Sequence, residues 1–177
     1  MNRIETARLI LREWTEADLV PFSQINSDAE VMEHFPRMLS YDESVEFYRR
    51  ITGEFAECGW GLFAVELKET GEFIGYTGFH RFDFDAEFSP GVEIGWRLAS
   101  RHWGNGYATE AAKACIEYAR EKGLAARLYS FTAVCNVRSR RVMQKAGLEY
   151  AGNFMHPALP DGHRLKEHVL YRIEFQK

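Results

Sequence analysis

A glycine-rich segment in the middle of the chain has residues suited to binding a phosphate group. It reads Arg101-His102-Trp103-Gly104-Asn105-Gly106-Tyr107-Ala108 and lies between a strand-like run and a helix-like run. A helix N-terminus presents unpaired N–H groups and a partial positive charge. Glycines let several such groups converge on phosphate oxygens, and Arg101 adds a charge-assisted donor. The segment therefore predicts an anion site, with a diphosphate as its expected ligand.

Two common nucleotide-binding motifs do not fit these letters. A P-loop requires Gly-Lys-Ser or Gly-Lys-Thr, which is absent here. A dinucleotide-binding loop requires a third glycine and follows an early strand, and neither condition holds. A nucleotide or nicotinamide enzyme is therefore a remote alternative.

An acidic residue interrupts the apolar run that precedes the glycine segment. Glu93 stands within Val92–Leu98, and a carboxylate at such a place can act as a general base or can simply face solvent. His80 and His102 are alternative bases, because histidine titrates near neutral pH. A polar loop over residues 83–90 precedes this run and carries acids that could attract a cationic substrate: Asp83, Asp85 and Glu87.

Asn136 and Ser139 stand at the start of a second helix-like run, residues 138–146. Their spacing is that of helix-capping residues. A capping residue also lies at the mouth of a helix, where it can contact a ligand, so the two roles are compatible.

The elements that must position these residues follow from periodicity. Strands are expected at residues 9–12, 62–67, 73–82, 92–98, 128–134 and 168–175. Helices are expected after Thr15, after Ser40, over residues 106–122 and over residues 138–146. Short links predict an antiparallel meander in the first half, and strand, helix, strand in the second half predicts a parallel crossover. The result is a mixed-sheet α+β fold.

Composition limits the classes of protein. The chain has 177 residues, which suits a single domain over residues 1–177. Lys and Arg number 22 against 26 Asp and Glu, so the net charge of −4 argues against nucleic-acid binding. Three cysteines without a Cys-x-x-Cys pair suggest neither a disulfide framework nor a metal site. No signal peptide or membrane span is expected, and the cytoplasm is the expected compartment.

Three segments in order resemble the GNAT superfamily of N-acetyltransferases. They are the glycine segment after Glu93-Ile94-Gly95-Trp96, then Asn136-Val137-Arg138-Ser139 with Ala146-Gly147-Leu148, and the opening Thr6-Ala7-Arg8-Leu9-Ile10-Leu11-Arg12. Together they resemble the RimJ/RimL branch, which acetylates ribosomal-protein N-termini. The resemblance implies a GNAT-type fold, with a mixed six- to seven-stranded sheet and about four helices, that binds acetyl-CoA and needs no metal.

The resemblance also implies roles for particular residues. Backbone groups of Trp96, Arg97 and Leu98 would contact pantetheine and the oxyanion, where the strand splays at a bulge eased by Gly95. Asn136 would hydrogen-bond pantetheine, Ser139 would act as general acid near the sulfur, and Glu93 would be the base. The loop residues implied in cofactor binding are Arg101, Trp103, Gly104, Asn105, Gly106, Tyr107, Ala108 and Thr109. Expected around the acceptor are Phe35, Trp60, Phe79, His80 and Phe154, with a loop over residues 156–164 near the entrance.

The expected reaction is direct attack of a primary amine on acetyl-CoA in a ternary complex. A protein N-terminal α-amine, as in ribosomal proteins, is the preferred acceptor. A polyamine, an amino acid or an antibiotic is an alternative acceptor, and a non-catalytic CoA-binding regulatory module is an alternative class. Either a monomer or a homodimer is compatible with the sequence.

Overall fold

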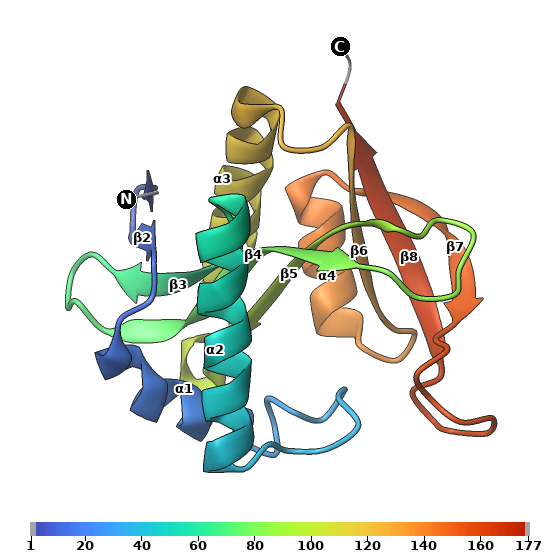
Figure 1. Ribbon diagram of the computed structural model, residues 1–177, viewed down its shortest axis with the longest axis horizontal. Coiled ribbons are helices and arrows are strands. Elements are labelled where there is room, and N and C mark those ends of the chain that lie inside the picture. Colours follow the sequence, from blue (N-terminus) through green and yellow to red (C-terminus); the bar gives the residue numbers. More distant parts are fainter. Residues whose placement is uncertain (1–2, 176–177) are drawn as a thin grey trace.

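A single mixed sheet of eight strands forms the centre of the molecule. The computed structural model describes residues 3–175. The strands lie in the order β1-β2-β3-β4-β5-β6-β8-β7 (Figure 1). Their bounds are β1 Ile4–Glu5, β2 Leu9–Arg12, β3 Leu62–Leu67, β4 Phe73–Phe82, β5 Gly91–Leu98, β6 Arg127–Ala133, β7 Glu149–Met155 and β8 Glu167–Glu174. Among the pairs of these described strands, only β5–β6 is parallel, as the crossover prediction requires.

Four α-helices and two short 3₁₀ turns complete the described fold. The α-helices are α1 Leu19–Asn26, α2 Tyr41–Cys58, α3 Tyr107–Lys122 and α4 Val137–Ala146, and the 3₁₀ turns are Glu16–Asp18 and Ser100–His102. The expected capping box at the start of α2 is confirmed, because the Glu43 amide donates to Ser40 Oγ and the Ser40 amide donates to the Glu43 carboxylate. Over residues 3–175, no helix combines the length and apolarity needed to cross a membrane.

The helices cover opposite faces of the central strands (Figure 1). On one face, Phe22 of α1 and Ile51 of α2 pack against Tyr76 of β4. On the other face, Ala112 of α3 packs in a cluster with Ile94 of β5. Side chains of a strand point alternately to the two faces, so each strand contributes to both layers.

Two strands were not expected from the sequence. β1 has only two residues, too few for a periodic pattern. In β7 the register with β8 shifts between Tyr150 and Gly152, and Gly152 has a φ of 127°. An irregularity of this kind interrupts the alternation by which strands are recognised, which explains why the expected six to seven strands became eight.

The β5–β6 pair separates almost as soon as it forms. Glu93 and Tyr129 are its one registered pair among the described residues. The β4–β5 pair, in contrast, keeps its register without a shift from Gly91 to Leu98. The prediction of a bulge at Gly95 is therefore wrong for the β4–β5 pair. The splay lies between β5 and β6, because β6 diverges from β5 beyond Glu93.

Candidate active site

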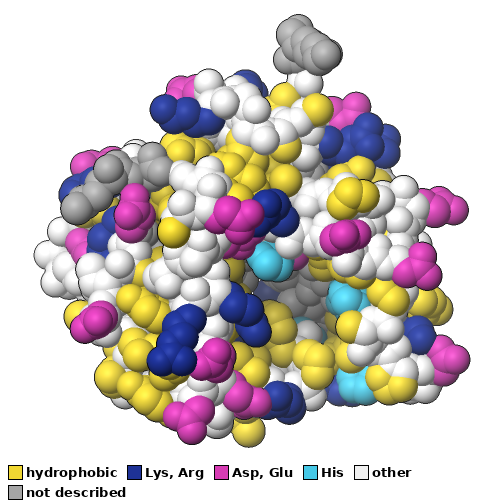
Figure 2. Space-filling view, in the orientation of Figure 1, with side chains coloured by type: hydrophobic (Ala, Val, Ile, Leu, Met, Phe, Trp, Pro, Cys, Tyr) yellow, Lys and Arg dark blue, Asp and Glu magenta, His cyan; other side chains and the backbone are white. Residues whose placement is uncertain are grey.

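A cavity of about 1320 Å³ opens where β5 and β6 separate. Its lining includes Glu54 of α2 and Glu93 of β5 on one face of the sheet, and Thr109 of α3 and Ser139 of α4 on the other. The cavity thus reaches both faces through the splay. Figure 2 shows its mouth as a hollow with histidine side chains at the rim.

The start of α3 is open toward this cavity. Gly104 and Gly106 have φ values of 80° and 81°, a left-handed conformation that favours glycine. Gly106 is the N-cap and no side chain caps it. The first amide groups of the helix, at Tyr107, Ala108 and Thr109, have no acceptor within the helix. Within the segment of residues 104–109, every residue except Asn105 lines the cavity. The segment expected to bind an anion therefore borders the cavity.

Two residues of the same loop face away from the cavity. Arg101 does not line it, and its guanidinium donates to Glu72 Oε1 at 2.6 Å while remaining largely exposed. Asn105 is also outside the lining, and its side-chain amide donates to the His102 carbonyl. The structure thus gives both residues contacts that hold the loop, and it leaves the backbone amides as the donors that face the cavity.

Cations on α4 were missed by the sequence interpretation. Arg138, Arg141 and Lys145 line the cavity, and Arg138 lies over the Trp103 ring at 4.3 Å. Their spacing of three and four residues puts them on one helix face. That spacing is visible in the sequence and could have identified them.

The free edge of β5 faces the gap left by β6. The Ala99 amide donates to the Ile74 carbonyl, so the peptide groups of Ala99 point to β4. Because these groups alternate in direction along a strand, the groups of every second residue before Ala99 also point to β4. The intervening groups of Trp96 and Leu98 point toward the gap, whereas those of Arg97 point to β4, so the backbone contact expected of Arg97 does not fit this geometry. The Leu98 carbonyl there accepts from Trp103 Nε1 at 2.9 Å. The edge therefore presents backbone groups to an extended ligand.

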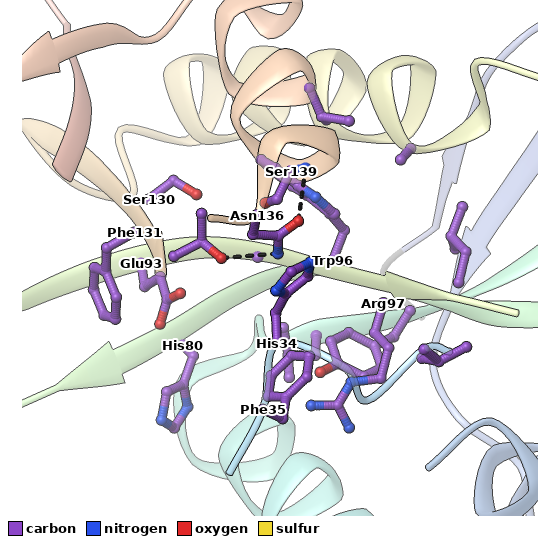
Figure 3. A pocket seen from close by; sticks show the side chains of 18 of the residues that line it. His34, Phe35, His80, Glu93, Trp96, Arg97, Ser130, Phe131, Asn136 and Ser139 are labelled. Atoms are coloured by element: carbon purple, nitrogen blue, oxygen red, sulfur yellow. Dashed lines mark hydrogen bonds between the residues drawn. The ribbon is translucent and has the colours of Figure 1, made fainter. Parts of the chain in front are cut away.

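Asn136 and Ser139 lie where α4 begins. Asn136 is the N-cap, and its Oδ1 accepts from the Ser139 amide at 3.2 Å. Asn136 Nδ2 donates to Thr132 Oγ1 at 2.9 Å, which leaves one of its two N–H groups for a further acceptor. Both residues line the cavity, and no hydrogen bond within residues 3–175 uses the Ser139 hydroxyl (Figure 3).

The carboxyl of Glu93 occupies the other side of the same space. Burial raises the pKa of Glu93 to about 7, and the nearby charge of His80 opposes that rise. His80 is the cross-strand neighbour of Glu93 and lines the cavity. His80 Nδ1 lies 3.0 Å from Glu54 Oε2, and this hydrogen bond raises the pKa of His80. A carboxyl with a pKa near neutral is suited to proton transfer at physiological pH.

The expected acceptor residues divide into two groups. Phe35 and His80 line the cavity, but Trp60, Phe79 and Phe154 do not, so their assignment to the lining is wrong. Phe79 is fully buried because strand alternation turns it away from the His80 face. Trp60 packs edge-on against Phe79 with ring centres 6.0 Å apart. Phe154 belongs to an aromatic cluster beneath the lining residue Phe131.

The loop after β7 borders the entrance. His156, Ala158 and Leu159 line the cavity, and Arg164 donates to the Glu33 carbonyl at 2.6 Å. The acids Asp83, Asp85 and Glu87 are not part of the lining, nor is any group of three His, Cys, Asp or Glu found in residues 3–175 that could hold a metal ion.

One cavity thus holds an open helix N-terminus, a free strand edge and a carboxyl whose pKa is near neutral. These are the components of an acyl-CoA-dependent transferase. The family model described as "Acetyltransferase (GNAT) domain" matches residues 8–149. The chain belongs to this family and is an acetyl-CoA-dependent N-acetyltransferase.

Individual relatives agree with that membership. The uncharacterized N-acetyltransferase YnaD of Bacillus subtilis is 30% identical over 174 residues, which cover 96% of this chain and 95% of the relative. A GNAT-family acetyltransferase structure from Bacillus anthracis is 26% identical, with a TM-score of 0.82 and 98% of each chain covered. RimL, a ribosomal L7/L12 α-N-protein acetyltransferase solved with coenzyme A, has a TM-score of 0.77 and 98% coverage of each chain. At 14% identity, that last likeness concerns the fold alone.

Proposed function

We propose that this acetyltransferase acts on the α-amine of a protein N-terminus, as members of the RimJ/RimL branch do, through a ternary complex in which Glu93 is the base. The observation that carries the proposal is the Glu93 carboxyl, with its raised pKa of about 7, beside the splay of β5 and β6. The opening segment Thr6–Arg12 and the fold shared with RimL support the choice of acceptor. The wide cavity mouth between α2 and the loop after β7 offers room for an extended peptide.

The residues present fit acetyl-CoA. The uncapped amides at the start of α3 suit its diphosphate, and the cationic face of α4 adds charge of the right sign. The backbone groups of Trp96 and Leu98 can pair with the amides of the pantetheine arm, as an added strand would. The remaining N–H of Asn136 is a further donor. Arg101 and Asn105 are assigned to holding the loop.

Each proposed chemical role falls on a group that faces the cavity. Acetyl-CoA supplies an activated thioester carbon. Glu93, directly or through a water molecule, takes the proton that the acceptor ammonium must lose before its nitrogen can attack. Backbone N–H groups at the β5 edge stabilise the negative charge that develops on the carbonyl oxygen. The Ser139 hydroxyl gives a proton to the departing sulfur and regains one from the attacking nitrogen, which must lose its second proton as the amide forms. Glu93 returns the first proton to solvent.

Thiol release with a panel of acceptors tests this proposal. Peptides with free N-termini should release CoA and gain an acetyl group at the α-amine, as detected by mass spectrometry. The same peptides with a blocked N-terminus and an internal lysine should not react. Acetylation of diamines or free amino acids, without acetylation of peptides, would replace the protein acceptor by a small amine. Tight acetyl-CoA binding with no thiol release on any acceptor would indicate a binding module.

A further inference from the structure

A positively charged side chain is buried at the cavity without a carboxylate partner. Arg97 is only 7% exposed and yet lines the cavity. Its Nη1 donates to Asn26 Oδ1 at 2.6 Å, while its Nε has no hydrogen-bond partner. Within residues 3–175, Arg97 makes no ion pair with an acidic residue. Burying a charge in this way is costly unless something compensates it.

A neutral network holds this guanidinium in place. The Ser44 hydroxyl donates to the Ser40 carbonyl, and Asn26 Nδ2 donates to Ser44 Oγ at 3.1 Å. Because Nδ2 of the Asn26 side chain faces Ser44, the side-chain oxygen Oδ1 must face Arg97. The Phe35 ring lies 4.1 Å from the guanidinium carbon, and the Tyr76 ring lies 5.5 Å away. These contacts orient the guanidinium but bring no negative charge, and within the described residues only one of its five N–H donors is used.

Arg97 and Glu93 share a strand face. They are four residues apart in β5, on the face that contains their β4 partners Tyr76 and His80. In an extended strand this spacing is roughly 13 Å. Gly95 lies between them, and a Cβ there would meet only Glu93 Oε1, at 3.7 Å. The floor between the two charged groups is thus free of side chains. Figure 3 shows Glu93 and Arg97 at opposite ends of this stretch, with Phe35 beside Arg97.

We infer that Arg97 binds a carboxylate of the acceptor, so that the enzyme prefers peptides with Asp or Glu at the second or third residue. This rests on the proposed function, which places the acceptor amine at Glu93. An extended chain covers about 3.3–3.6 Å per residue, so an acidic side chain at those positions reaches the far end of the floor. The free donors of Arg97 suit a carboxylate, which guanidinium can bind through two parallel hydrogen bonds.

The cavity lining also contains glutamates, but Glu54 is paired with His80 and Glu57 with Arg81. The unpaired cations at the acceptor side therefore support an acceptor with an anionic group. Besides Arg97, the cavity lining contains Arg50 on α2, which lies near His80 and over the Phe47 ring and makes no ion pair within residues 3–175. A polycation such as a polyamine would meet both charges. An acidic peptide would be attracted by Arg50 at the mouth and then bound by Arg97 inside.

Paired peptides test the inference. Free N-terminal peptides that differ only in Glu against Gln, at position 2 or position 3, are compared by kcat/KM. The wild-type enzyme should prefer the Glu peptide by at least about tenfold. Arg97→Met should abolish the preference without changing KM for acetyl-CoA, whereas Arg97→Lys should keep part of it. Arg49→Met is the matched control, because Arg49 is exposed on α2 outside this cavity and should keep the full preference.

The outcomes separate the two proposals. Equal use of both peptides by the wild type, or an unchanged preference in Arg97→Met, would overturn the role of Arg97. An equal loss of kcat/KM on both peptides would show that Arg97 has a structural role only. If Arg97→Met does not fold, the preference of the wild type between the two peptides decides the question. Acetylation of a linear ω-amino acid of matching span, with no peptide acetylated, would remove the protein acceptor and keep Arg97. If nothing is acetylated, calorimetric binding of the peptide pair to the CoA-loaded protein and to Arg97→Met still tests the inference.

Discussion

Glu93 and His80 are direct partners across the β4–β5 pair, and both side chains line the same cavity. His80 is in turn hydrogen-bonded to Glu54, which lies on α2. Burial alone would raise the pKa of Glu54, but the hydrogen bonds from His80 and the Arg81 amide lower it. The ionised Glu54 therefore holds His80 beside Glu93. This arrangement links the proposed base to a second titrating group and makes several consequences measurable.

The first prediction concerns the pH dependence of catalysis. Because Glu93 must be ionised to accept a proton and its pKa is about 7, kcat/KM should rise with pH up to about 7 and then level. Glu93→Gln should lower kcat/KM by roughly 10²–10⁴-fold and should lose this rise. Glu87→Gln, a change at an exposed acid outside the cavity, is the control and should behave like the wild type. Unchanged acetyl transfer by Glu93→Gln would remove Glu93 from the mechanism.

The second prediction concerns stability. The folded protein raises the pKa of Glu93 from 4.5 to about 7, so between these pH values the folded state binds more protons than the unfolded state. The free energy of unfolding must then fall as pH rises through this window. Glu93→Gln removes this loss, so at pH 8 it should be more stable than the wild type by ~1–3 kcal/mol, a range that allows for the partial exposure of the side chain to the cavity. Urea unfolding at pH 4.5 and pH 8 measures the difference, which should vanish at the lower pH. If Glu93→Gln were less stable than the wild type at pH 8, burial would not be the cause of a raised Glu93 pKa.

The third prediction separates His80 from the base itself. Positive charge on His80 opposes the rise in the pKa of Glu93. His80→Asn removes that charge, so the rise of kcat/KM should move to higher pH while the plateau remains. Loss of the pH dependence altogether would instead identify His80 as the base. KM for acetyl-CoA serves as the internal control and should not change.

Parts of this site can be predicted from sequence because they depend on local chemistry. Glycines with positive φ at the start of α3 and the Asn136 N-cap of α4 involve residues close in the chain. The parallel crossover also follows from the order of strand and helix. The placement of Phe35 depended on family resemblance.

Other parts depend on contacts between distant segments. Arg101 has the right type and position for a phosphate, but Glu72, which directly precedes β4, binds its guanidinium. Phe79 and His80 are neighbours in sequence, yet only the second faces the cavity, and the face that each takes is set by the pairing with β5, in which His80 lies opposite Glu93. The burial of Arg97 depends on Asn26 and Phe35, which are far away in the chain.

The fourth prediction uses two glycines with similar conformations. Gly104 and Gly123 have φ values of 80° and 59°, and a Cβ at either would meet no atom within 4 Å. Replacing each by alanine should cost a similar ~1–2 kcal/mol, because only the left-handed backbone is strained. Gly104→Ala should also raise KM for acetyl-CoA about tenfold, since Gly104 lines the cavity, whereas Gly123→Ala should leave it unchanged. Equal KM values for the two variants would argue against a diphosphate at this loop.

The fifth prediction separates the two roles of Asn136. Its Oδ1 caps α4 by accepting from the Ser139 amide, whereas its free N–H is assigned to the pantetheine arm. Asn136→Asp keeps a capping oxygen but has no N–H, and Thr132 can donate to the new carboxylate in place of accepting. Asn136→Ala loses both functions and should cost about 1 kcal/mol of stability. Asn136→Asp should therefore melt like the wild type, yet both variants should bind acetyl-CoA several-fold more weakly by calorimetry. Wild-type affinity in Asn136→Asp would restrict Asn136 to capping, because the loss in Asn136→Ala would then follow from disorder at the start of α4 rather than from a missing donor.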